Sequence, residues 1–219
     1  MKTFIKLIAP LLLLAGAHAA AQPAMPDFSK AFEAGKVRRA QVFEIMPARP
    51  GCIEFAGGSI MEDCEWKELL ADDRIINRGI DGDTVEGLKA RLPELLRHDP
   101  SAVFLEIGSS ELGTLTAEEA VGGIGEIVSA FRKNDPSVEI YLFSSLPPSS
   151  GSDVTKEAVL DYNARLKGLC EQEGLVYIDL YSVFVSSDGY LPAEYGRSSV
   201  KLAPCAYALV GKTLTNYIQ

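Results

Sequence analysis

Residues 52–60 read CIEFAGGSI, a short apolar run that ends in two glycines and a serine. An apolar run of this length that stops at a glycine turn is typical of a buried strand. Four later apolar runs follow it, separated by longer amphipathic stretches, and this alternation predicts a mostly parallel sheet with helices on both faces. The predicted strands are residues 53–56, 75–77, 102–107, 140–144 and 176–180, and the predicted helices are residues 83–96, 117–133, 155–173 and 204–217.

The first 21 residues have the pattern of an export signal. Lys2 and Lys6 precede an apolar run at residues 7–17, which small residues then follow. The run is shorter than the roughly 20 residues that a bilayer span needs, and the first cysteine, Cys52, lies too far along for a lipoprotein signal. We therefore expect an exported protein, periplasmic or secreted, with no stable membrane anchor.

The charge of the remaining chain argues against nucleic acid as a partner. Removing the two lysines of residues 1–21 leaves 19 basic side chains against 30 acidic ones, a formal charge of −11. Such a chain repels phosphate backbones. The 47% hydrophobic content argues for a folded core rather than for disorder.

The mature chain is interpreted as one domain, residues 51–219, preceded by an N-terminal helical segment at residues 22–50. Its cysteines are dispersed, with no CxxC pair, and only one histidine remains after the signal, so no metal site is expected. The sequence leaves open the oligomeric state, and it leaves open whether the thiols are free or paired. The cysteines are Cys52, Cys64, Cys170 and Cys205.

Loops that follow the predicted strands carry the candidate functional residues, because ligands of open parallel sheets bind outside the carboxyl ends of the strands. Four segments, three of them such loops, resemble the SGNH or GDSL hydrolase family in their order and spacing. The likeness covers roughly residues 52–217. The segments are 55–60 (FAGGSI), 77–84 (NRGIDGDT), 108–112 (GSSEL) and 202–207 (LAPCAY).

This resemblance implies a three-layer, flavodoxin-like α/β fold with about five strands, and acyl-ester hydrolysis without a cofactor. By position, Ser59 is the nucleophile of such an enzyme, and Gly79 and Ser110 hold the oxyanion. Ser110 replaces the asparagine of the family pattern. Lys201 stands where the family has its histidine base, and Ser198 where it has the aspartate that orients the histidine.

The first segment can also be interpreted as purely structural. Gly57 and Gly58 also suit a tight turn between a strand and a helix, and Ser59 also suits the N-cap of that helix.

The chain has no histidine to replace the missing base. His18 lies in the predicted signal, and His98 precedes the strand at residues 102–107, at the opposite pole of the sheet. A Ser59–Lys201 pair could act instead only if the lysine were neutral, which requires lowering its pKa from about 10.4 to about 7, or roughly 4 to 5 kcal/mol. Nearby carboxylates oppose this, and a charged Lys201 would serve as an ion-pair partner instead.

Two hypotheses follow. The first is an impaired or divergent esterase that acts on an acyl or acetyl ester of a small molecule, a glycan or a lipid. The second is a non-catalytic binding protein, a pseudoenzyme that keeps the same cleft.

Overall fold

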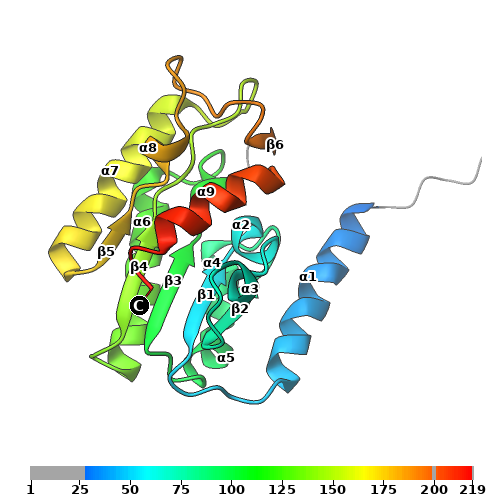
Figure 1. Cartoon of the computed structure of the whole chain (residues 1–219), viewed down its shortest axis with the longest axis vertical. Coiled ribbons are helices and arrows are strands. Elements are labelled where there is room, and N and C mark those ends of the chain that lie inside the picture. The colour runs from blue at the N-terminus through cyan, green and yellow to red at the C-terminus, as the bar shows by residue number, and fades with distance from the viewer. Residues whose placement is uncertain (1–27, 199–200, 219) are drawn as a thin grey trace, which may run out of the picture.

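The computed structural model describes residues 28–198 and 201–218, with side chains described for residues 32–196 and 201–218. The predicted signal peptide at residues 1–21 lies outside this part of the chain. Figure 1 shows a central parallel sheet with helices packed on both of its faces.

The sheet has five parallel strands in the order β2-β1-β3-β4-β5, which confirms the predicted flavodoxin-like α/β fold. In its centre, Phe55 of β1 lies opposite Asn77 of β2 and Phe104 of β3. The strand order reverses its direction at β1, so the loops after β1 and β3 diverge and leave room for a site. The strands are β1 (Ile53–Gly57), β2 (Ile75–Gly79), β3 (Ala102–Glu106), β4 (Glu139–Phe143) and β5 (Val176–Ile178).

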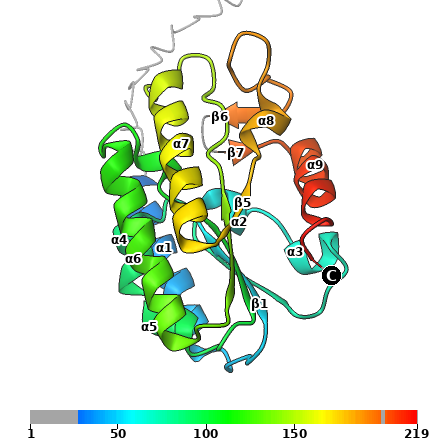
Figure 2. The ribbon, with the colours of Figure 1, turned by 90° about the vertical axis from the view of Figure 1, so that its left-hand side faces the viewer.

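Successive side chains of each strand point to opposite faces of the sheet, which divides the core into two apolar layers. Val103 and Leu105 of β3 pack with α4, α5, α6 and α7, whereas Phe104 packs with α2, α3, α8 and α9 on the other face. Figure 2 shows these two helical layers on either side of the sheet. The helices are α2 (Ser59–Glu62), α3 (Trp66–Leu69), α4 (Val85–Ala90), α5 (Leu92–Leu96), α6 (Ala117–Asn134), α7 (Lys156–Glu173), α8 (Tyr181–Phe184) and α9 (Pro204–Leu214).

The N-terminal helix α1 (Phe28–Ile45) stands beside β2, the edge strand of the sheet (Figure 1). Arg39 Nε donates a hydrogen bond to the Gly79 carbonyl at 2.7 Å, and Lys36 Nζ donates one to the Gly82 carbonyl at 3.0 Å. The helix therefore contacts the end of β2 and the loop that follows it. A helix beside an edge strand also hinders pairing with other chains.

Parts of the secondary structure differ from the prediction. The helix predicted at residues 83–96 is broken at Arg91 into α4 and α5, because Pro93 has no N–H to donate and its ring clashes with the preceding turn. In addition, β6 (Gly196–Ser198) and β7 (Lys201–Leu202) form a small antiparallel pair that the apolar pattern does not reveal.

The cysteine question is settled in favour of free thiols. Three of the four are buried and one, Cys205, is exposed. Burial raises the pKa of Cys64 and of Cys170 to about 11, which keeps both protonated and unreactive at neutral pH.

No helix within residues 28–198 and 201–218 has the length and apolar character to cross a bilayer.

Candidate active site

Ser59 is the first residue of α2, directly after the turn that ends β1. Gly57 has a φ of +145°, and the Gly58 N–H donates to the Glu106 carbonyl at 3.0 Å, so the chain turns sharply against β3. Gly58 is the N-cap of α2, so the capping interpretation does not account for the serine. Ser59 is buried, and its side chain lines a cavity at the carboxyl ends of the strands.

The cavity has a volume of about 110 Å³ and is built by the loops that the sequence predicts to be functional. Its floor and walls come from the segments after β1, β2, β3 and β4, together with the first turn of α7. The lining residues are Gly58, Ser59, Ile60, Asp81, Gly82, Asp83, Glu106, Ile107, Gly108, Ser109, Ser110, Ser145, Leu146, Pro148, Ser152, Val154 and Val159.

Gly79 does not have the place that the resemblance implied for an oxyanion donor. Its N–H donates to Asn77 Oδ1 at 2.8 Å, and it is not among the residues that line the cavity. A Cβ at this position would lie 2.2 Å from the Glu62 nitrogen, so Gly79 serves the close packing of β2 against α2. The expectation for Gly79 is therefore corrected.

Gly82, three residues further along, lines the cavity together with Ser59. Within the described residues, no group accepts a hydrogen bond from its N–H. Its φ is +70°, a conformation that favours glycine. Gly82 is thus a glycine of the same loop that does line the cavity, and the sequence analysis did not single it out. Ser110 also lines the cavity, from the 3₁₀ turn at Ser109–Glu111.

Lys201 is a charged ion-pair partner rather than a base. Its Nζ lies 2.8 Å from Asp81 Oδ2 and 3.5 Å from Asp63 Oδ2. The hydrogen bond with Asp81 raises the pKa of Lys201 above its ordinary value, so the ammonium stays protonated at neutral pH. A protonated ammonium cannot accept the Ser59 proton, so these contacts argue against Lys201 as the base.

Ser198 belongs to β6, four residues before the end of β7, but its side chain lies outside the described part of the structure. Its role at the position of the family aspartate remains a prediction.

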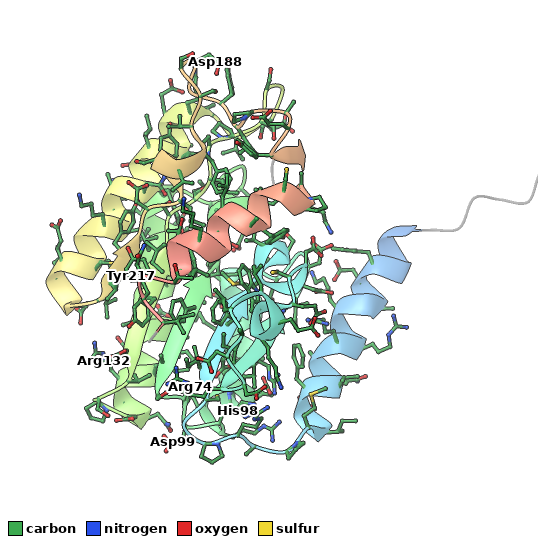
Figure 3. The ribbon with its side chains drawn as sticks, in the orientation of Figure 1. Arg74, His98, Asp99, Arg132, Asp188 and Tyr217 are labelled. Carbon is green, nitrogen blue, oxygen red and sulfur yellow. The ribbon has the colours of Figure 1, made fainter. Side chains whose placement is uncertain are left out.

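His98 takes no part in the site. It is fully buried beside Asp99 and the start of β3, far from the cavity residues, at the lower end of the view in Figure 3. Its Nδ1 accepts a hydrogen bond from the Arg49 N–H at 3.0 Å, and its Nε2 lies 3.0 Å from Glu94 Oε1. Burial lowers the pKa of His98, so the ring is neutral at pH 7 and serves the packing of this pole.

Two buried glutamates have different surroundings. Glu54 of β1 lies at the same pole as His98, where burial raises its pKa well above the ordinary value. Glu106 ends β3 and lines the cavity, with Ser109 Oγ donating to its Oε1 at 2.8 Å. Neither carboxyl forms an ion pair with Arg78 or Lys201, because Arg78 pairs with Glu94 at 3.0 Å and Lys201 pairs with Asp81 and Asp63.

Within the described residues, no group of three or more His, Cys, Asp or Glu side chains is arranged to hold a metal ion.

The sheet order, and a serine that heads the helix after the first strand, place the chain among flavodoxin-like α/β proteins with a serine-lined site. Residues 57–204 match the GDSL-like lipase/acylhydrolase family. The chain belongs to this family, which confirms the resemblance carried by its sequence segments.

Individual proteins are similar to this chain in sequence or in fold. The chain is 29% identical over 171 residues to platelet-activating factor acetylhydrolase IB subunit alpha2 from Rattus norvegicus, which covers 75% of this chain and 74% of the relative. A GDSL-like lipase from Bacteroides thetaiotaomicron superposes with a TM-score of 0.71 at 17% identity, over 84% of this chain and 96% of the other. A variant of an acetyl-xylooligosaccharide esterase from Geobacillus superposes with a TM-score of 0.61 at 18% identity, over 78% and 95%.

Proposed function

We propose that this protein hydrolyses esters of short acyl groups, with Ser59 as the nucleophile, and that it does so slowly. The observation that carries the proposal is the position of Ser59 at the head of α2, in the wall of a cavity that Gly82 and Ser110 also line. In acyl transfer, a serine needs backbone or side-chain donors near it to hold the oxyanion. The Gly82 N–H and the Ser110 hydroxyl are the donors of this kind that we assign.

Slow turnover follows from the substituted groups. A positioned general base contributes about 10²- to 10⁴-fold to such reactions, and the histidine that would supply it is replaced by the charged Lys201. Loss of one oxyanion donor costs on the order of 3 kcal/mol in the transition state, and a serine hydroxyl at position 110 replaces an amide. Both changes lower the rate without removing the nucleophile.

The cavity favours a small acyl group. Its volume of about 110 Å³ is below the range of roughly 300 to 1,000 Å³ that drug-sized ligands occupy. Ile60, Leu146, Val154 and Val159 supply apolar contacts for a short acyl chain. Two similar proteins, an acetylhydrolase and an acetyl-xylooligosaccharide esterase, have names that agree with an acetyl group. We propose an acetyl ester of a small molecule, a glycan or a lipid as the substrate.

Ser59→Ala should reduce the hydrolysis of p-nitrophenyl acetate to the rate of the buffer, because no other group in the proposed reaction attacks the ester. The wild type should show a slow but measurable rate, and it should prefer acetate to octanoate because of the small cavity. Initial rates of both proteins on both esters measure this. Equal rates for wild type and Ser59→Ala would show that any turnover does not use this serine.

A non-catalytic binding role is the second candidate, and one observation favours it. Lys201 and Asp81 form an ion pair at the edge of the cavity, where the family pattern has its base. In that case the cavity would hold an ester without cleaving it. The rate comparison above separates the two functions. For either one, we propose export of the mature chain, on the basis of residues 1–21.

A further inference from the structure

Three carboxyl groups line the cavity, and two of them are held by cations. Asp81 pairs with Lys201 at 2.8 Å, and Asp83 pairs with Arg91 at 2.8 Å. The third carboxyl, that of Glu106, has no Lys, Arg or His partner among the described residues. Its carboxyl accepts a hydrogen bond from Ser109 Oγ. Glu106 is therefore the carboxyl in the cavity that is not already engaged by a positive charge.

Glu106 also lies beside the turn that leads into Ser59. It ends β3 opposite Gly57 in the parallel register, and its carbonyl accepts the Gly58 N–H. An atom at the Cβ position of Gly58 would lie 3.8 Å from Glu106 Oε2, which places the carboxyl beside the residue that precedes Ser59. Glu106 is only 5% exposed and lines the cavity, so its carboxyl is shielded from bulk water.

We propose that Glu106 is the general base for Ser59, acting directly or through one water in the cavity. The Ser59 hydroxyl proton passes to the Glu106 carboxylate as the serine oxygen bonds to the ester carbonyl carbon. When the tetrahedral intermediate collapses, the bond to the alcohol oxygen breaks, and the Glu106 carboxyl returns the proton to the leaving alcohol. Water then hydrolyses the acyl-enzyme by the same proton transfers, which release the acid and restore Ser59.

The electrostatics of the site support this role. Burial raises the pKa of Glu106, while the hydrogen bond from Ser109 lowers it by a smaller amount. A base whose pKa lies nearer the working pH accepts a proton more effectively. The other titratable groups around it are Asp81 and Asp83 in the cavity, together with two tyrosines. Glu106 raises the pKa of Tyr162 on α7 and of Tyr207 on α9, although burial is the larger cause for both.

This inference rests on the proposed hydrolase function, and its test is a pH profile of kcat/KM for p-nitrophenyl acetate. Because the carboxylate is the active form, the wild-type rate should rise with pH through a midpoint above 4.5 and then reach a plateau. Glu106→Gln should lower the plateau by about a hundredfold or more and remove this rise. Glu54→Gln is the matched control. It makes the same change in another buried glutamate, one strand away and outside the cavity. This control should keep the wild-type plateau of kcat/KM and the rise with pH.

A second variant keeps the test decisive if Glu106→Gln folds poorly. Ser109→Ala removes the hydrogen bond that lowers the pKa of Glu106, so the midpoint of the rise should move to higher pH. An unmoved midpoint would overturn the inference. A Glu106→Gln profile like that of the wild type, alongside an inactive Ser59→Ala, would also overturn it while leaving the hydrolase function intact. A wild type without any Ser59-dependent rate would overturn both.

Discussion

Restoring the family's groups with Ser110→Asn, Ser198→Asp and Lys201→His is expected to raise kcat/KM for p-nitrophenyl acetate by about a hundredfold or more. The histidine supplies a base whose ordinary pKa is about 6.5, and the asparagine supplies an amide donor for the oxyanion. Asp81 and Asp63, which now hold Lys201, would raise the pKa of the new histidine. The pH profile of the triple variant should therefore gain a rise with its midpoint at or above about 6.5.

The control for this gain is the same triple variant with Ser59→Ala added, which should lose it entirely. A triple variant that folds but gains nothing would mean that β7 does not present position 201 to the serine. The assignment of Lys201 to the histidine position would then be wrong.

Gly57→Ala is expected to destabilise the protein by about 4 kcal/mol or more, a large part of the stability of an ordinary domain. A Cβ at this position would lie 1.9 Å from the Glu106 carbonyl oxygen, and the φ of +145° adds backbone strain. Neither strand can move away easily, because β1 is paired with both β2 and β3. Urea unfolding followed by circular dichroism measures the free energy of unfolding.

Gly122→Ala is the matched control for that substitution. Gly122 lies within α6, and nothing lies within 4 Å of its added Cβ. Alanine is the better helix former by about 0.8 to 1.0 kcal/mol, so this variant should be as stable as the wild type or more stable. If the two variants unfold at the same urea concentration, the close contact of Gly57 with β3 is not present.

The sheet could be predicted from the sequence because its strands are continuous apolar runs. All five residues of β1 and of β3 are buried, as expected for strands that helices cover on both faces. The short elements could not be predicted. The helices α2, α3 and α8 have four residues each, which is about one turn and too short to show a helical period.

The sequence predicted which loops form the site, but not the side-chain contacts within it. The Gly-Gly-Ser turn after β1 correctly indicated that Ser59 faces the carboxyl end of the sheet. Gly79 was assigned wrongly because its N–H is engaged by Asn77, whose side chain accepts from that N–H and donates to the Met61 carbonyl at 2.7 Å. Such a contact between β2 and α2 leaves no periodic signal in the sequence.

The sequence predicted that carboxylates surround Lys201, but not which ones. An acidic chain made nearby carboxylates expected, and the structure supplies Asp63 and Asp81, which come from α2's C-terminal end and from the loop after β2. Their approach depends on how β7 packs near α2, which is a tertiary contact. The position of Glu106 in the cavity wall also depends on tertiary packing. The sequence of a buried strand does not indicate which cavity its side chains line.

Whether Ser59 is the nucleophile can be measured by labelling the mature chain with a fluorophosphonate and locating the adduct by peptide mass spectrometry. We expect one adduct per chain, on Ser59, formed slowly and absent from Ser59→Ala. An unlabelled wild type, or an adduct on Ser109, Ser110 or Ser145 of the same cavity, would contradict it.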